Sequence, residues 1–213
     1  MEMKKLMSCA CAAVAAGVCL AGAGETIKLP KPDLDSGMTV TEALKARHSE
    51  RDFSDRELSL EELSGVLWAA NGFNRPDKRT NATALNKQTI EIYVCMKKGA
   101  YRYDAKANSL IKVCDDDLRE AVAGAQAFAA KAPVSLVIAA DVSDPIYANP
   151  PRDTLTHYDA GIVSGNIYLY CAANRLATVC RATMDREALK KALKLPKNKI
   201  LHLNHPVGHL VAK

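Results

Sequence analysis

The first part of the chain carries two helix signals in the spacing of its apolar and capping residues. Thr39-x-x-Glu42 and Ser59-x-x-Glu62 each have the form of a capping box, in which the serine or threonine begins a helix and the glutamate closes its first turn. After Ser59, apolar residues recur every three or four positions, the period of one helix face, until Asn71-Gly72. We therefore predict a short helix after Thr39 and a longer helix that ends at Asn71-Gly72.

From Thr89 the apolar residues alternate with polar ones, which is typical of a β-strand with one buried face. Turn residues at 98–99 and 107–108 separate this segment from two further strand-like runs, so an antiparallel meander is expected. The run 134–140 is apolar without interruption, which predicts a central strand covered on both faces. Between the meander and this run, three aspartates at 115–117 suit the start of an alanine-rich helix that continues up to the run.

Two more helices and a strand complete the pattern. Residues 156–174 are apolar on nearly every face of a helix, which is typical of a helix buried in a core or in a subunit interface. Residues 185–195 predict a last helix, and residues 199–203 a last strand. The order of these elements favours an α+β fold with a mostly antiparallel central sheet flanked by helices.

The N-terminal residues differ from the rest of the chain. A charged start is followed by an apolar run of small residues that ends in Ala21-Gly22-Ala23. Residues 1–23 are therefore predicted to be a secretory signal peptide, with an uncleaved membrane anchor as the alternative. Cleavage would leave an extended lead-in at 24–38 and one domain at 39–213. We expect an exported protein, periplasmic or secreted, that is not held in a membrane after cleavage.

Composition narrows the partners and the chemistry. The net charge of +5 is modest and the lysines are scattered, which argues against nucleic acid as a partner. His202, His205 and His209 have a metal-like spacing, but Pro206 and Gly208 exclude a helix there, so no metal site is expected. Export permits disulfides, yet the cysteines after the signal segment lie in apolar patterns and are expected to be free and buried. These are Cys95, Cys114, Cys171 and Cys180.

The segment Arg47-His48-Ser49-Glu50-Arg51 brings two arginines close together. Like charges at this spacing need water or an anion between them. If the chain leaves the helix there, the arginines and the serine share one side and can form half of an anion site. If the helix continues, the segment is a solvated helix end where cations suit the dipole. A second segment, 79–94, places Asn86 and Gln88 before a strand, where carboxamides can read the edge of a heteroaromatic ring.

These segments resemble, in order, the motifs of the FMN-dependent nitroreductase family, in the branch that includes thiazoline and oxazoline dehydrogenases. The matching segments are 47–51 (R-[RH]-S-x-[RK]), 82–88 (P-S-x-x-N-x-Q), 159–161 (D-A-G), 175–182 (G-L-x-T-x-x-R-G) and 207–210 (V-G-Y-P). The chain departs from the family pattern at a few positions. Ala82 and Thr83 replace Pro-Ser, Ala182 replaces a glycine, and Leu210 replaces a proline.

The resemblance implies a nitroreductase-like fold and FMN bound at the interface of a homodimer, with residues of both subunits around it. It also implies a ping-pong reaction in which NAD(P)H or another donor gives a hydride to flavin N5. A small organic acceptor, such as a nitro compound or a quinone, then takes the reducing equivalents. Because the flavin carries the chemistry, no side chain is assigned as catalytic.

The same resemblance assigns roles to individual residues. Arg47, His48 and Ser49 would hold phosphate and ribityl oxygens, and Arg51 would stabilise negative charge on the reduced ring. Asn86 would bind the ring, with support from Gln88. The full set of cofactor-binding residues that the motifs imply is Arg47, His48, Ser49, Arg51, Thr83, Asn86, Gln88, Arg181, Ala182 and Gly208.

Two alternatives to this function remain open. One is a different flavin reaction on the same fold, such as azoline oxidation, reductive dehalogenation or flavin fragmentation. The other is a non-catalytic exported protein that has kept the fold and lost FMN, for which the missing Pro-Ser pair is the main argument.

Overall fold

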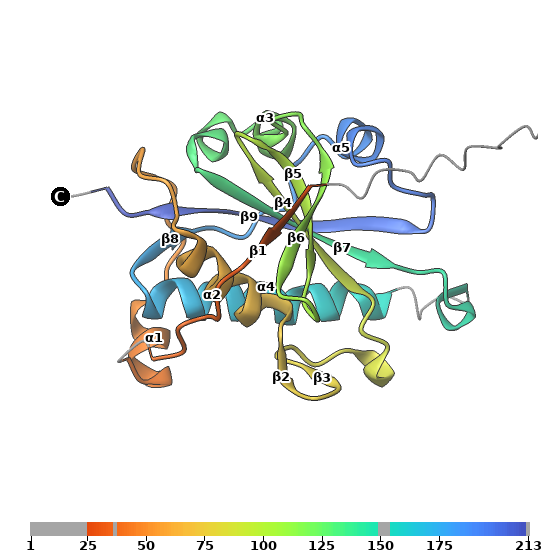
Figure 1. Cartoon of the computed structure of the whole chain (residues 1–213), viewed down its shortest axis with the longest axis horizontal. Helices are drawn as coiled ribbons and strands as arrows, with labels where there is room; N and C mark the ends of the chain where they lie inside the picture. The colour runs from red at the N-terminus through yellow and green to blue at the C-terminus, as the bar shows by residue number, and fades with distance from the viewer. Residues whose placement is uncertain (1–24, 36–37, 149–153, 212–213) are drawn as a thin grey trace, which may run out of the picture.

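The computed structural model describes residues 25–35, 38–148 and 154–211, so the predicted signal segment lies outside the described residues. A seven-stranded sheet forms the centre of the molecule, with every neighbouring pair of strands antiparallel. Its order is β1-β6-β5-β4-β7-β9-β8 (Figure 1). The strands are β1 (Thr26–Lys28), β4 (Ile90–Met96), β5 (Gly99–Asp104), β6 (Ser109–Cys114), β7 (Val134–Asp141), β8 (Leu176–Thr178) and β9 (Lys199–His209). The predicted α+β class with a mostly antiparallel sheet is confirmed.

Helices cover both faces of this sheet. On one face α1, α2 and α4 lie together, and on the other lie α3 and α5 (Figure 1). The helices are α1 (Val40–Ala46), α2 (Leu60–Asn71), α3 (Arg119–Ala123), α4 (Leu155–Ala173) and α5 (Arg186–Ala192), with short 3₁₀ turns η1 (Ala84–Asn86), η2 (Ala127–Lys131) and η3 (Pro145–Ala148). A separate two-stranded hairpin, β2 (Phe73–Arg75) with β3 (Lys78–Arg79), follows α2.

The central strands divide their side chains between two apolar layers. In β4, Ile92 and Val94 pack with α2 and α4, whereas Tyr93 and Cys95 pack with α3 and α5. In β7, Leu136 and Ile138 pack in the first layer and Val137 and Ala139 in the second, so both faces of this uninterrupted apolar run are covered, as predicted. Burying each such isoleucine or valine contributes about 1.5–3 kcal/mol to the free energy of unfolding. These two layers are therefore the main stabilising contacts of the sheet.

Both predicted capping boxes form. The backbone N–H of Glu42 donates to Thr39 Oγ1 at 3.3 Å, and the N–H of Thr39 donates to the Glu42 carboxylate at 2.8 Å. The corresponding distances at Ser59 and Glu62 are 3.1 and 2.8 Å. These bonds satisfy N–H groups that have no partner within the helix, so α1 and α2 begin where the sequence indicates.

The alanine-rich helix predicted from 115–117 up to Pro133 is wrong. The helix is only α3, and the chain continues as a 3₁₀ turn. Gly124 at φ +53° ends α3, and the Arg181 guanidinium donates to the carbonyls of Val122 and Ala123 at 3.1 and 2.6 Å. Gly124 turns the chain out of the helix, and Arg181 supplies donors to carbonyls that have no partner in a further helical turn, so a contact distant in sequence stabilises this helix end.

The structure extends one predicted strand and adds others that were not predicted. Part of the predicted lead-in at 24–38 is β1, which pairs with β6. The last strand runs to His209 instead of ending at residue 203, because it has β7 along one edge and β8 along the other. Strand β8 itself and the β2–β3 hairpin carried no periodic signal, since strands of two or three residues are too short to show one.

Candidate functional site

The arginine segment leaves the helix, which decides between the two interpretations of its sequence. Helix α1 ends at Ala46, and Arg47 turns out of it with ψ at 119°. The N–H of Glu50 then donates to Thr178 O at 2.9 Å, which fixes the segment beside β8. Its arginines, His48 and Ser49 remain exposed. The interpretation in which the helix continues through this segment is therefore wrong.

Tyr168, from the C-terminal half of α4, connects the arginine segment to the residues that follow β8. Its hydroxyl lies 2.8 Å from Ser49 Oγ and accepts a hydrogen bond from the backbone N–H of Cys180, also at 2.8 Å. The guanidinium carbon of Arg47 stands 5.0 Å from the centre of the Tyr168 ring, within cation–π range. Tyr168 was missed from the sequence, although a tyrosine in an otherwise apolar helix needs a partner for its hydroxyl.

Arg51 faces the segment that follows β8 across a hollow of about 240 Å³, lined also by Cys180, Arg181 and Ala182. The Arg51 guanidinium makes one weak contact, to Ser49 O at 3.4 Å. Ala182 is small and exposed. The fold thus brings four of the predicted site residues, Ser49, Arg51, Arg181 and Ala182, into one region.

Arg181 and Gly208 have structural contacts of their own. The buried Arg181 guanidinium donates to Gln126 and to the side-chain oxygen of Asn204, besides the two carbonyls of α3, and burial lowers its pKa. Its side chain is therefore already occupied inside the protein. A Cβ atom at Gly208 would lie 2.8 Å from Pro133 Cδ and 3.2 Å from Phe53 Cδ1, so the strand needs glycine there for packing.

Thr83, Asn86 and Gln88 lie in a second cluster, around η1. The backbone is left-handed at Leu85, Asn86 and Gln88, each with φ at 53°, a conformation that costs about 1 kcal/mol or more in residues other than glycine. The N–H of Gln88 donates to Thr83 Oγ1 at 3.0 Å, and Gln88 Nε2 donates to Asn86 Oδ1 at 3.2 Å. These bonds hold the strained loop in one shape.

Asp159 of α4 also holds this loop. Its Oδ1 accepts from the backbone N–H of Ala84 at 2.9 Å, while its Oδ2 is buried without a hydrogen-bond partner. Burial raises the pKa of this carboxyl above its ordinary value. Because D-A-G was identified in the sequence only as a family motif without a contact, this bond to the loop was not foreseen.

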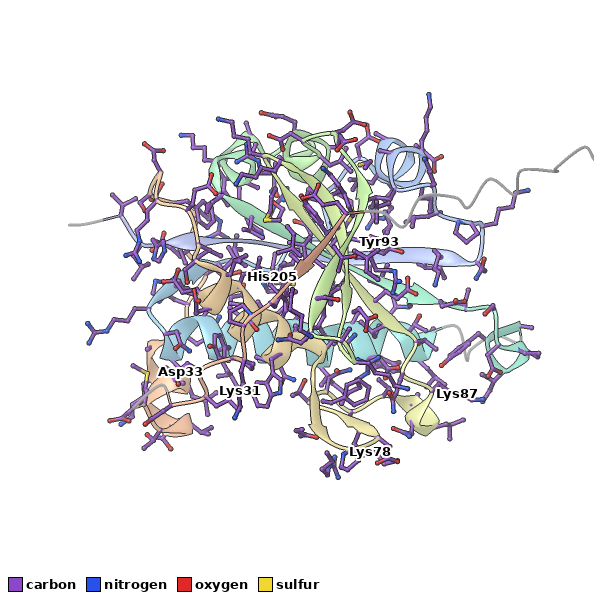
Figure 2. The ribbon with its side chains drawn as sticks, in the orientation of Figure 1. Lys31, Asp33, Lys78, Lys87, Tyr93 and His205 are labelled. Atoms are coloured by element: carbon purple, nitrogen blue, oxygen red, sulfur yellow. The ribbon has the colours of Figure 1, made fainter. Side chains whose placement is uncertain are left out.

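The two clusters lie at opposite ends of α4. Asp159 holds one and Tyr168 the other, and nine residues at a rise of 1.5 Å place them about 13 Å apart along the helix axis. Lys87, which follows the η1 loop, lies far from α1 (Figure 2). The predicted residues therefore form two separate clusters within one chain.

Two features are absent from the described residues. The described residues contain no group of three or more histidine, cysteine, aspartate or glutamate side chains that could hold a metal ion. None of the helices described is long and apolar enough to cross a membrane. Cys95, Cys114, Cys171 and Cys180 are free, as predicted, although only Cys95 and Cys171 are fully buried.

Comparison with known proteins identifies one family. A model described as the nitroreductase family matches residues 44–209. A crystal structure of a candidate nitroreductase from Ralstonia eutropha JMP134 is 34% identical, with a TM-score of 0.80 over 88% of this chain and 90% of that one. A candidate nitroreductase of Methanocaldococcus jannaschii is 28% identical over 201 residues, 88% of this chain and 99% of that protein.

The fold extends to more distant proteins. A chain of the Escherichia coli microcin synthetase complex is 16% identical and superposes with a TM-score of 0.67 over 75% of this chain and 67% of its own length, a likeness of fold alone. The family model spans most of the sequence and includes both clusters. This chain belongs to the nitroreductase family.

Proposed function

We propose that this protein is an FMN-dependent oxidoreductase that works as a homodimer, with one cofactor site built from a half-site of each subunit. The observation that carries this proposal is the separation of the two half-sites along α4. A single chain holds the arginine segment and the η1 loop about 13 Å apart on the helix axis, so neither is complete by itself.

The surface of α4 between the half-sites suits such a partner. Tyr158 and Ile162 are 66% and 42% exposed, and ideal Cβ atoms at Gly161 and Gly165 would meet nothing within 4 Å. These residues form an exposed stripe of apolar and small side chains at helical spacing, over which a second helix can approach closely. A two-fold axis near this stripe pairs the same surface of both subunits.

The same two-fold axis would also bring a half-site of one subunit next to the other half-site of its partner. The middle of the interval between Asp159 and Tyr168 falls between Gly161 and Gly165, where the axis would cross α4. Antiparallel pairing there sets the N-terminal end of one α4 beside the C-terminal end of the other. The η1 loop of each subunit would then face the arginine segment of its partner.

The residues of both halves fit FMN chemically. Among the described residues, neither Arg47 nor Arg51 has a carboxylate within ion-pair distance, so both can bind an anionic ligand. Arg47, with His48 and Ser49, would hold the phosphate and ribityl oxygens. Asn86, whose Oδ1 is occupied by Gln88, keeps its amide N–H groups for the edge of the ring.

Bound FMN would supply the hydride transfer itself. Arg51 would place positive charge beside a ring that gains electrons, which raises its reduction potential. Exposed, small Ala182 would leave one side of the ring open, so that NAD(P)H or another donor and then a small acceptor, such as a nitro compound or a quinone, can use the same place in turn. From residues 1–23 we further propose that this takes place outside the cytoplasm.

The absorption spectrum of the purified protein, measured together with its sedimentation, tests this proposal. We expect flavin bands and a dimer. Colourless protein that takes up no added FMN and sediments as a monomer would instead identify a non-catalytic member of the fold. Flavin-loaded protein that reduces neither nitro compounds nor quinones would favour another flavin reaction.

A further inference from the structure

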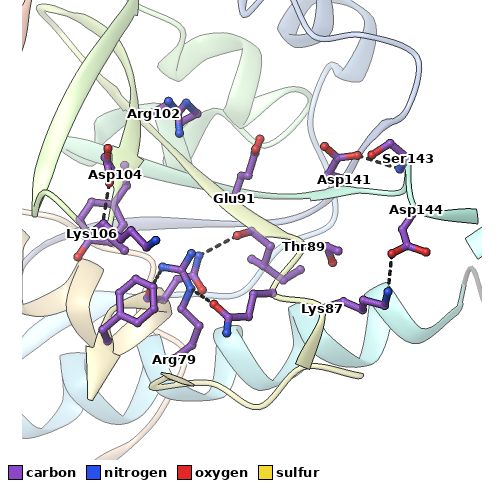
Figure 3. Close-up of a pocket in the computed structure, with 16 residues that line it drawn as sticks. Arg79, Lys87, Thr89, Glu91, Arg102, Asp104, Lys106, Asp141, Ser143 and Asp144 are labelled. Carbon is purple, nitrogen blue, oxygen red and sulfur yellow. Dashed lines mark hydrogen bonds and ion pairs between the residues drawn. The ribbon is translucent and has the colours of Figure 1, made fainter. Parts of the chain in front are cut away.

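A second cavity, of about 490 Å³, lies away from the arginine segment (Figure 3). Its walls come from the β2–β3 hairpin, the start of β4, the end of β5 and the end of β7. The volume is within the range of small-molecule sites. None of the residues that the nitroreductase motifs assign to FMN lines it except Gln88, at its edge.

Arg79 of β3 brings a positive charge without an ion-pair partner among the described residues into this cavity. Its half-buried guanidinium donates from Nε to Gln88 Oε1 at 3.1 Å and from Nη1 to Asn71 O at 2.9 Å, and it stacks 4.2 Å from the centre of the Phe73 ring. Both acceptors are neutral, and burial lowers the pKa of the guanidinium. In the described part of the chain no carboxylate lies within ion-pair distance of it, an arrangement that is costly unless an anion binds.

The carboxylates around the cavity are already engaged. Glu91 and Asp141 both bind Lys199, at 2.7 and 2.8 Å, and Asp144 binds Lys87. Asp104 accepts the backbone N–H groups of residues 106 and 107 at 3.0 and 3.1 Å, which closes the turn after β5. Glu91 and Asp141 thus share one lysine and Asp144 has its own, while Asp104 acts on the charge of Arg79 only from beyond ion-pair distance.

Several donors, in contrast, remain without a partner. The hydroxyl of Thr89 is buried and makes no hydrogen bond. Within the described residues, the side chains of Arg102 and Lys106 form no ion pair, and Arg79 keeps its Nη2 free. Figure 3 shows Arg102 and Lys106 on the side of the cavity away from the Lys87–Asp144 pair. The cavity thus presents more donors than acceptors.

We infer that this cavity binds a small organic anion through a carboxylate or phosphate group, with Arg79 and Thr89 at its inner wall and Arg102 and Lys106 at its mouth. A guanidinium offers the planar pair of donors that both groups accept. Because Arg79 also holds the Gln88 amide, the occupied cavity adjoins the η1 loop of the proposed FMN site. The inference does not depend on that function.

Titration of the purified chain with inorganic phosphate and, separately, with succinate tests the site. The signals to follow in nitrogen-15 NMR spectra are the Arg79 Nε–H and the Thr89 amide. We expect saturable shifts with at least one anion, and about tenfold weaker binding in Lys106→Ala and in Arg102→Ala, which each remove one charge-assisted contact at the mouth. The stronger of the two anions identifies the group that the site prefers.

Two control variants test whether the shifts arise from binding in this cavity. Arg75→Ala removes an exposed arginine of the same hairpin outside the cavity, and should bind like the parent. Arg47→Ala removes the proposed FMN phosphate contact, and should also leave these shifts unchanged. The inference would be overturned if neither anion shifts these signals, or if Lys106→Ala and Arg102→Ala both bind the anion as tightly as the parent. It would also be overturned if the shifts disappear in Arg47→Ala. Each of these outcomes can be read whether or not the protein binds FMN.

Discussion

The two ends of α4 are held in place by different means. At the C-terminal end, Tyr168 rests against His205, a fully buried ring 5.2 Å away, whose nitrogens lie 2.8 Å from Ser164 Oγ and 3.0 Å from Thr178 Oγ1. At the N-terminal end, Asp159 anchors a loop with three left-handed residues and keeps one buried oxygen without a partner. The first half-site is built on a satisfied polar cluster in the core, and the second on a strained loop.

The cluster around His205 also fixes the state of its ring. Thr178 Oγ1 donates to Pro206 O at 2.9 Å, so it can only accept from His205 Nδ1–H, and His205 Nε2 then accepts from Ser164. Burial lowers the pKa of His205 to about 3, which keeps the ring neutral. A rigid half-site suits a phosphate clamp, whereas a strained loop is typical of a part whose final contacts come from a ligand or a partner.

The largest effect is expected from a substitution in the exposed stripe of α4, which lies between the two ends of the helix. Gly165→Glu adds a charge to the exposed stripe of α4 where the isolated chain has free space, so the variant should fold. We expect it to sediment as a monomer and to lose FMN, because neither half-site is complete alone. Gly161→Ala is the matched control and should still dimerise. A folded Gly165→Glu dimer that retains FMN would show that the site needs no partner.

Acid should weaken the core cluster at the C-terminal end. The folded-state pKa of His205 lies below its ordinary value of 6.5, so between about pH 6.5 and about pH 3 the unfolded chain binds a proton that the folded chain does not. Stability is retained above this window and falls as the pH is lowered through it, by up to about 1.4 kcal/mol per pH unit. Urea unfolding at several pH values measures the slope.

The variant His205→Gln isolates this effect, because glutamine can donate and accept but does not titrate. It should lose part of the slope, although His202, with a pKa lowered to about 4 chiefly by burial, still contributes. Equal slopes in the parent and in His205→Gln would mean that His205 does not limit acid stability.

Replacing Arg47 and replacing Arg51 should change different properties of the bound flavin. Arg47→Ala should weaken FMN binding by about tenfold or more, since each charge-assisted hydrogen bond lost is worth about 1.5–3 kcal/mol. Arg51→Gln should retain more FMN but lower the midpoint potential of the flavin by tens of millivolts, with ~30 mV corresponding to ~1.4 kcal/mol. Fluorescence titration and equilibration with redox dyes measure both. Two variants that match the parent would show that the arginine segment is an exposed loop that does not contact the flavin.

The smallest effect is expected in the strained loop. Leu85 is 70% exposed and left-handed, so Leu85→Gly should raise the free energy of unfolding by a few tenths to about 1 kcal/mol. Leu44, 57% exposed in α1, is the matched control, and Leu44→Gly should lower the same quantity by about 0.5–1 kcal/mol. Chemical denaturation measures the change in the free energy of unfolding for both variants. If the two changes have the same sign, the loop carries no backbone strain.

Local pattern alone was enough for much of this protein. The capping residues Thr39 and Ser59 begin α1 and α2, and the alternation after Thr89 and the apolar run at 134–140 predict β4 and β7. These features depend on neighbours within a few residues, so spacing reveals them. The family motifs likewise marked both segments that become half-sites.

The tertiary structure alone decided where those segments lie and what supports them. Tyr168 meets Ser49 across 119 residues, and Arg181 donates to the carbonyls at the end of α3 across 58 and 59 residues. The pairing of β1 with β6 and the charge of Arg79 left without a counterion follow in the same way. Contacts between residues so distant in sequence depend on how strands and helices pack, and no local period encodes that packing.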